Sequence, residues 1–171
     1  HAEGGPQIIC AHYEDGIRGA ASRADADAVA AYCAVRDIPC VIETGDVPRY
    51  AQRHHLSLET AARICRYDFL HRLQEQEHCD AIALAHHADD LAETVLMRIL
   101  RGTGPAGLAA MREWDGVHLR PLLHTARTEI ERYIRAHELH PCHDLTNDQQ
   151  DAQRNRIRHT LLPTLCTYGN R

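Results

Sequence analysis

The feature that most constrains the fold of this 171-residue chain is the run at 81–108, where an apolar segment passes through two histidines and two aspartates into a helical pattern. Ala81 to Ala85 predict a buried strand, and from Leu91 onward apolar residues recur three and four apart, which predicts an amphipathic helix. His86 to Asp90 therefore form a strand-to-helix turn. In an open α/β sheet such turns lie at the carboxyl edge, where ligands bind.

Three carboxylates crowd the first turn of this expected helix. Asp90 and Glu93 are three residues apart and Asp89 and Glu93 are four apart, so they lie on neighbouring faces. The helix N-terminus stabilises each by only about 0.3–1 kcal/mol, whereas two carboxylates about 5 Å apart at an effective dielectric constant near 20 repel by roughly 3 kcal/mol. The turn therefore calls for a divalent metal such as Mg2+, an ammonium group, or a proton on one carboxyl group. An ordinary acidic, solvated helix start is the alternative.

The same helix ends with Arg98 and Arg101, followed by Gly102-Thr103-Gly104. The glycines are typical of a helix C-cap and turn. Carboxylates at one end and guanidiniums at the other suit a substrate that carries both a cation and phosphate.

Strands and helices alternate along the first part of the chain. Strands are expected at 8–12, 39–44 and 81–85, and helices at 20–36, 57–76 and 89–101, with Ser57 as an N-cap. This alternation predicts an α/β fold with a Rossmann-like parallel sheet flanked by helices. Helices expected at 125–137 and 151–165 indicate a C-terminal helical extension. We therefore divide the chain into an α/β domain at 1–108 and an extension at 109–171.

The composition favours a cytoplasmic protein without membrane contact. No apolar run approaches the roughly 18 residues of a membrane span, and no signal peptide is visible. The seven cysteines form no CxxC pair and no Cys/His spacing of the zinc-site type, so free thiols in a reducing compartment are expected. The basic residues are all arginine and are concentrated after Met97. The carboxyl half is therefore the candidate for nucleic-acid contact, although a preference of the genome for arginine codons explains the absence of lysine equally well.

HHADDLAETVLMRILRGTGPAGLAAM at 86–111 resembles the central signature of the tRNA(Ile)-lysidine synthase family, which belongs to the PP-loop, or N-type, ATP pyrophosphatase superfamily. Three further blocks agree in the same order, at 57–70, 120–134 and 144–165. The resemblance covers about Ile8 to Leu165. A lone HHxDD is a weak signal, whereas four blocks in order are a strong one.

The resemblance implies an adenine nucleotide alpha hydrolase-like fold and an ATP-dependent ligase. In that family ATP adenylates the C2 oxygen of the wobble cytidine of tRNA(Ile) with a CAU anticodon. Pyrophosphate leaves, and the ε-amine of free L-lysine then attacks C2 and expels AMP. ATP and Mg2+ are the implied cofactors, tRNA(Ile) and lysine are the implied partners, and a homodimer is compatible with the family.

The resemblance and the residue pattern together define the candidate site. The catalytic candidates are Asp89, Asp90, Glu93 and Arg66, with Asp89 and Asp90 as metal ligands. The nucleotide-binding candidates are His12, Arg18, His86 and His87. The candidates for substrate or tRNA contact are Arg63, Arg98, Arg101, Arg154, Arg156 and Arg158.

Three of these assignments have structural alternatives. The turn after the first strand is similar to the family's H-x-x-H-G-L-R motif through His12 and Arg18, but Asp15 replaces its second histidine, and a plain glycine turn fits equally well. Arg63 is adjacent to Tyr67 on one helix and is expected to reach phosphate or to pair with Glu59. Arg154 and Arg158 share a helical face opposite the expected buried residues Ile157, Leu161 and Leu165, and that face either meets tRNA phosphates or is merely solvated.

The SGGxDS loop for which the superfamily is named is absent from the chain, and Gly4-Gly5-Pro6 precedes the first strand instead of following it. We therefore expect a piece of the enzyme that lacks the opening βα unit and the C-terminal domains and that forms no lysidine by itself.

Other classes of protein remain open. A metal-dependent phosphohydrolase would use His86, His87, Asp89 and Asp90 as metal ligands. A non-catalytic RNA-binding module would need only the arginine-rich half. A tRNA-thiolating PP-loop enzyme is disfavoured by the lack of paired cysteines.

Overall fold

The computed structural model describes residues 5–109, 111–142 and 153–169. The chain divides into two compact units, residues 1–80 and 81–171. The boundary expected between residues 108 and 109 is a different division and stays a prediction. Residues 144–152 of the fourth family-like block lie outside the described part of the chain.

The first unit begins with a β-α-β arrangement. Strand β1 (Cys10–Glu14) and strand β2 (Cys40–Thr44) pair in parallel, with Cys10 opposite Cys40 and Glu14 opposite Thr44. Parallel neighbours require a crossover, and helix α1 (Ala20–Ala34) provides it. The expected parallel sheet and crossover helix are therefore confirmed, although β1 begins and ends two residues later than expected.

Two further helices complete this unit. Helix α3 (Leu58–Gln76) begins where predicted, because the Ser57 hydroxyl accepts a hydrogen bond from the Thr60 N–H at 3.2 Å. Helix α2 (Val47–His54) was not expected; Asp46 caps it, and its residues Val47 and Ala51, four apart, are buried against Ala61 of α3.

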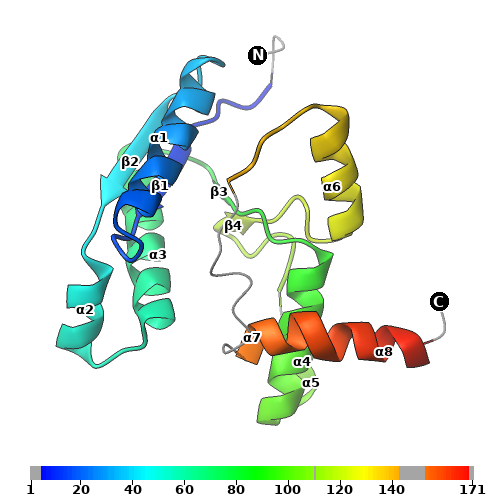
Figure 1. Ribbon diagram of the computed structural model, residues 1–171. Coiled ribbons are helices and arrows are strands. Elements are labelled where there is room, and N and C mark those ends of the chain that lie inside the picture. Colours follow the sequence, from blue (N-terminus) through cyan, green and yellow to red (C-terminus); the bar gives the residue numbers. More distant parts are fainter. Residues whose placement is uncertain (1–4, 110, 143–152, 170–171) are drawn as a thin grey trace. The chain divides into compact units, whose positions relative to one another are not determined.

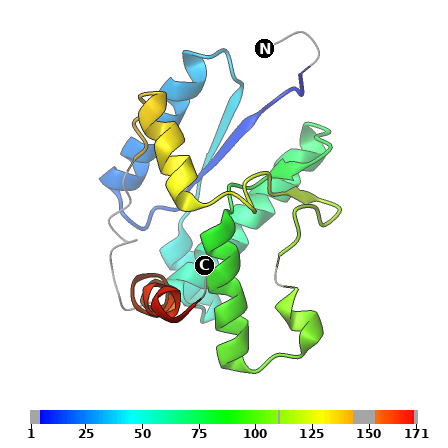
Figure 2. The ribbon, with the colours of Figure 1, turned by 90° about the vertical axis from the view of Figure 1, so that its right-hand side faces the viewer.

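Helices α1 and α3 lie on opposite faces of the strand pair (Figures 1 and 2). The alternation of side chains along a strand explains this arrangement. Tyr13 of β1 packs its ring against Phe69 of α3, with 5.8 Å between the ring centroids, while Cys10, three positions earlier, faces Cys33 of α1.

The second unit also contains a parallel strand pair. Strand β3 (Ile82–Ala83) lies beside β4 (His118–Leu119), a strand that the sequence analysis did not predict. β3 is shorter than the expected strand at 81–85, and residues 84–87 continue as an irregular segment into helix α4 (Ala88–Arg101). The short helix α5 (Pro105–Leu108) follows the glycine turn.

Helices dominate the rest of this unit, as expected. Helix α6 spans Arg127–Ala136. The last helical stretch begins as α7 (Gln153–Arg156), widens into a π-helical segment (Ile157–Leu161) and ends as α8 (Leu162–Tyr168). Within the described residues, no helix combines the length and apolar character that crossing a membrane requires.

A turn ahead of β4 fixes the edge of the second strand pair. Asp115 accepts hydrogen bonds from the backbone N–H groups of His118 at 2.8 Å and Val117 at 3.2 Å, and from both terminal nitrogens of Arg120 at 3.0 Å. The His118 N–H is the largest influence, and with Arg120 and Val117 it holds the pKa of the Asp115 carboxyl below its ordinary value. The ionised carboxylate therefore stabilises the folded state.

We predict that Asp115→Asn lowers the free energy of unfolding at pH 7 by about 1 kcal/mol, because charged hydrogen bonds are lost at a partly exposed site. The folded-state pKa is lowered, so the wild type keeps this stabilisation above the ordinary carboxyl pKa near 4 and loses it as the pH falls further. Urea unfolding should show that the difference in free energy of unfolding between variant and wild type becomes smaller below about pH 4. Asp27→Asn, on the exposed part of α1, is the control; a gap that persists unchanged in acid would contradict the assignment.

Candidate functional site at the start of helix α4

The start of α4 is fixed by a reciprocal cap. The backbone N–H of His87, the N-cap residue, donates to Oδ2 of Asp90 at 3.0 Å. This is the carboxylate half of a capping box, in which the third helical residue reaches back to the cap. The His87 ring adds a second contact, because its Nε2 lies 3.4 Å from the same Asp90 oxygen. Asp90 is therefore held at the strand-to-helix turn by its local sequence.

Glu93, one helical turn further on, is completely buried and bound by two arginines of the C-terminal helical stretch. Arg154 donates from Nε to Oε2 at 2.7 Å. Arg158 donates from Nε to Oε1 at 2.5 Å and from its terminal nitrogen to Oε2 at 3.0 Å. The Arg158 contact is bidentate, the geometry in which guanidinium and carboxylate pair most strongly.

Asp90 shares these cations. Its Oδ1 lies 3.3 Å from a terminal nitrogen of Arg158 and 3.7 Å from one of Arg154. The hydrogen bonds from Arg158 to Glu93 are the main reason that the pKa of this guanidinium is raised above its ordinary value. The cation that the sequence required for the acidic turn is thus supplied, for two of the three carboxylates, by the protein itself.

Asp89 is the third carboxylate and differs from the other two. Its side chain is 44% exposed, whereas that of Asp90 is 14% exposed and that of Glu93 is 0% exposed. Its nearest described cation candidate is the His87 ring, with Nδ1 at 4.0 Å. Among the described residues of this cluster, two guanidiniums face three carboxylates, and Asp89 is the most exposed of the three.

The arginine placement corrects one expectation. Arg154 and Arg158 do share a face, but that face is turned toward the carboxylates of Glu93 and Asp90. A buried Glu93 carboxylate without a partner would destabilise the fold far more than a solvated one. Ile157 is buried as expected, whereas Leu165 is 43% exposed. On α4 the exposed Ile99 also lies outside the apolar face that the sequence predicted.

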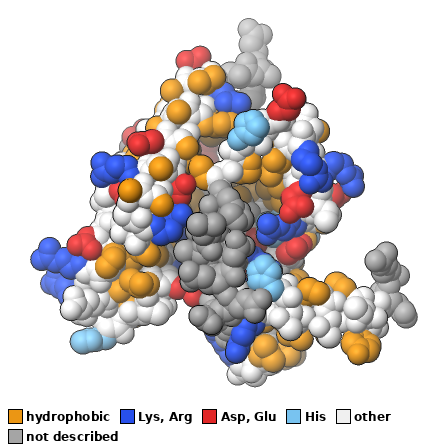
Figure 3. Space-filling view, viewed as in Figure 1, with side chains coloured by type: hydrophobic (Ala, Val, Ile, Leu, Met, Phe, Trp, Pro, Cys, Tyr) orange, Lys and Arg blue, Asp and Glu red, His pale blue; other side chains and the backbone are white. Residues whose placement is uncertain are grey.

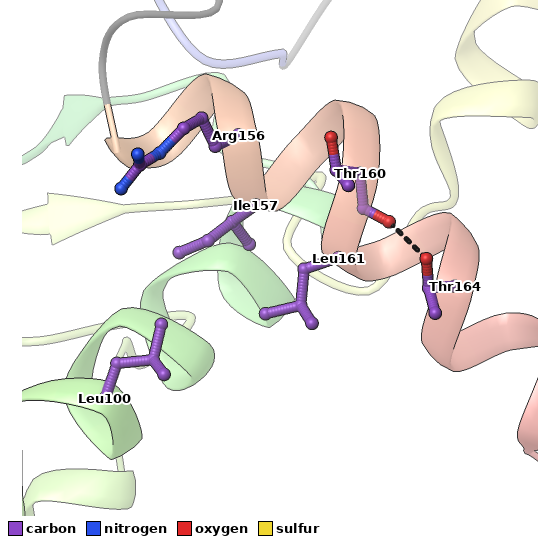
Figure 4. Close-up of a pocket in the computed structure, with 6 residues that line it drawn as sticks. All are labelled: Leu100, Arg156, Ile157, Thr160, Leu161 and Thr164. Carbon is purple, nitrogen blue, oxygen red and sulfur yellow. Dashed lines mark hydrogen bonds between the residues drawn. The ribbon is translucent and has the colours of Figure 1, made fainter.

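The other arginines of the second unit have separate positions. Arg98 donates to the carbonyl of Gly107 at 2.6 Å and so ties α4 to helix α5, across the glycine turn. Arg101 is exposed at the end of α4. Arg156 is exposed and, with Ile157 and Leu161, lines an apolar groove that also includes Leu100 of α4 (Figure 4).

Surface charge on α6 is mixed. Acidic and basic side chains lie next to one another over this helix (Figure 3), and Arg127 pairs with Glu131 at 2.9 Å. This helix therefore presents no surface of a single sign, and the excess of arginine in the carboxyl half does not by itself make a basic patch there.

The candidates in the first unit lie in strand β1, in the turn that follows it and in helix α3. His12 lies in the middle of β1 and not at its end, because the strand extends to Glu14. Arg18 pairs with Asp25 of α1 at 2.5 Å. On α3, Arg63 stacks over the ring of Tyr67 at 4.7 Å from its centroid and does so from an exposed position; Arg66 is exposed as well.

Asp15, which replaces the family's histidine, has a structural role in this turn. Its Oδ1 accepts hydrogen bonds from the Ile17 N–H at 3.0 Å and the Ser22 hydroxyl at 3.2 Å. Ser22 in turn accepts from the Arg18 N–H at 3.2 Å. Glu14, at the end of β1, is also buried; its position directly before a turn is the only sequence signal that it carries.

Comparison with known proteins places the chain. The model of the PP-loop domain family matches residues 2–165. The chain belongs to the PP-loop family. Among curated relatives of this PP-loop chain, the tRNA(Ile)-lysidine synthase of Clostridium tetani is 40% identical over 91% of the chain and 34% of the relative. The synthase of Geobacillus kaustophilus is 40% identical over 93% of the chain and 35% of the relative. The synthase of Bacillus subtilis is 39% identical over 92% of the chain and 34% of the relative.

A solved structure shares the fold of this PP-loop chain. The U34-tRNA thiolase NcsA from Methanococcus maripaludis, determined with its [4Fe-4S] cluster, matches 98% of the chain and 66% of that protein with a TM-score of 0.65 and 18% identity. The chain spans about a third of the length of the curated relatives it matches. The family and the α/β fold expected from the sequence are both confirmed.

We predict that Glu93→Gln lowers the free energy of unfolding by about 3 kcal/mol, the lower end of the cost of removing one partner from a buried ion pair, because Arg154 and Arg158 retain some solvent contact. Urea unfolding followed by circular dichroism measures the change. The matched control is Asp89→Asn, whose exposed carboxyl should change stability by no more than about 0.5 kcal/mol. Equal effects of the two substitutions would show that the buried pairing does not stabilise the fold.

Proposed function

We propose that this PP-loop chain is catalytic-core sequence of a tRNA(Ile)-lysidine synthase, which uses ATP to ligate free L-lysine to C2 of the wobble cytidine of tRNA(Ile) with a CAU anticodon. The observation that carries the proposal is the identity of about 40% to proteins of that name over more than nine-tenths of the chain. Membership of the PP-loop family supports the use of ATP. The cytoplasm stays the expected compartment.

The proposed reaction has two steps. The C2 oxygen of cytidine attacks the α-phosphate of ATP and pyrophosphate leaves. The lysine ε-amine then attacks C2, the bond to the adenylated oxygen breaks, and AMP departs. Each step brings a cation, either Mg2+ with the nucleotide or the lysine ammonium, close to phosphate, so an acidic group near arginines is a suitable environment.

We assign the cation contact chiefly to Asp89, with Asp90 beside it. Asp89 has the most exposed side chain of the three carboxylates, whereas Glu93 is occupied by Arg154 and Arg158. A single carboxylate together with nucleotide phosphates is a common donor set for Mg2+, so the residues fit this ion through Asp89. Glu93 serves in this proposal to position the arginines beside the cation contact.

The remaining assignments follow from exposure. For tRNA we propose the exposed arginines of α3, the end of α4 and the C-terminal helical stretch, namely Arg63, Arg66, Arg101 and Arg156, with Arg66 also available to the transferring phosphate. Arg98 would shape the glycine turn for this contact. For the nucleotide we propose His12 of β1 and Arg18 of the turn after it in the first unit, and, in the second unit, His86 and His87 after β3.

We predict that Asp89→Asn, made in the product of the complete gene, reduces lysidine formation about 100-fold, the usual cost of losing one electrostatic contact to a reacting group. Incorporation of labelled lysine into tRNA(Ile) with a CAU anticodon measures the rate. Glu131→Gln on α6 is the matched control and should keep full activity, and urea unfolding of Asp89→Asn should match the wild type.

Two results would count against these assignments in different ways. Wild-type kinetics for Asp89→Asn would remove Asp89 from the cation contact but leave the function standing. Failure of the wild-type protein to incorporate lysine, with ATP and tRNA(Ile) present, would overturn the proposed function itself.

We predict that Arg156→Ala weakens tRNA binding and reduces the slope of the logarithm of the binding constant against the logarithm of salt concentration by about 0.7–0.9, the value for one lost phosphate contact. The slope is measured by filter binding over a range of salt concentrations. Arg127→Ala, which removes an arginine already paired with Glu131, should leave it unchanged. Equal slopes for Arg156→Ala and the wild type would remove Arg156 from the tRNA contact.

A further inference from the structure

Three cysteines of the first unit lie together although they are far apart in the sequence. Cys10 and Cys40 are the first residues of β1 and β2 and face each other in the parallel register. Cys33 lies in the last turn of α1 and is buried. The three sulfur atoms all lie within 4.8 Å of one another.

The topology explains this meeting point. Helix α1 leaves from the carboxyl end of β1 and returns to the amino end of β2, so its last turn lies over the starts of both strands. The cluster is therefore at the opposite end of β1 from the turn that contains Asp15 and Arg18. It is therefore separate from the nucleotide contact proposed for Arg18.

The cluster has the composition and spacing of a metal-binding site. Cys33 is buried, and Cys10 and Cys40 are half-buried. Three sulfurs this close together can all ligate one metal ion, and a thiol that coordinates a metal ion is deprotonated by it.

We propose that Cys10, Cys33 and Cys40 form a binding site for one thiophilic d10 cation, Cu+ or Zn2+. Soft thiolate ligands select these ions. With metal–sulfur bonds of about 2.3 Å, three sulfurs around one ion are about 4.0 Å apart, so side-chain movements of less than about 1 Å close the site. Bound metal would join α1 to both strands at one point and stabilise the β-α-β arrangement.

The test uses the reduced, metal-free chain. Zn2+ and Cu+ are titrated separately against chromophoric chelators, the latter without oxygen, and Co2+ serves as the spectroscopic substitute for Zn2+. We expect one equivalent of metal per chain and thiolate-to-cobalt charge-transfer absorption. The relative affinities for Zn2+ and Cu+ decide which ion the site takes.

Alkylation of the cysteines in the wild-type chain shows which of them bind the metal, without any substitution. Cys10 and Cys40 are half-buried, whereas Cys142 and Cys166 are exposed. Bound metal should slow the reaction of Cys10 and Cys40 with iodoacetamide, as read by peptide mass spectrometry, while Cys142 and Cys166 react at unchanged rates. Protection of Cys142 and Cys166 in place of Cys10 and Cys40 would overturn the proposal.

Substitution adds a second criterion. Cys10→Ala and Cys40→Ala should each weaken metal binding by about 100-fold or more, since even loss of a group behind a ligand costs 10- to 100-fold. The matched control Cys79→Ser, elsewhere in the same unit, should bind as the wild type does. Absence of stoichiometric binding, or equal affinity in all three variants, overturns the site.

Discussion

The buried carboxylate of Glu93 is the interaction on which the second unit depends. It joins α4 to arginines 61 and 65 residues further along the chain, and Ile157, between these arginines, is buried as well. A buried carboxylate permits few arrangements of the groups around it, because each of its oxygens needs a hydrogen-bond donor. Charge pairing therefore fixes how the C-terminal helical stretch lies on α4, while Ile157 adds apolar packing and Ile99 and Leu165 stay exposed.

Sequence patterns predicted the elements that carry their own local signals. Ser57 caps α3 as expected, α1 and α4 lie close to their predicted bounds, and parallel pairing follows from the alternation of strands and helices. Of the missed elements, α2 does carry a local start signal, because Asp46 caps it and a proline follows. β4 has only two residues, too few to show a periodicity, and it lies between Asp115 and Arg120, which pair with each other.

For the candidate site, the sequence predicted that a cation must lie near the three carboxylates but did not predict which cation. Three carboxylates in one turn had to meet a cation, but the repulsion is the same whether metal, ammonium or guanidinium relieves it. Only the tertiary contact with Arg154 and Arg158 distinguishes these cases, and it spans more than 60 residues. The three clustered cysteines escaped notice for the same reason, because their proximity follows from strand register and a crossover helix and not from spacing along the chain.

The turn after β1 links two positions that are seven residues apart. Asp15 accepts from the Ser22 hydroxyl, and Ser22 accepts from the Arg18 backbone, so the loop is closed by a relay of small polar groups. An imidazole at position 15 offers one acceptor where the carboxylate offers several. A histidine at position 15 of this chain would therefore leave either the Ile17 N–H or the buried Ser22 hydroxyl without its acceptor.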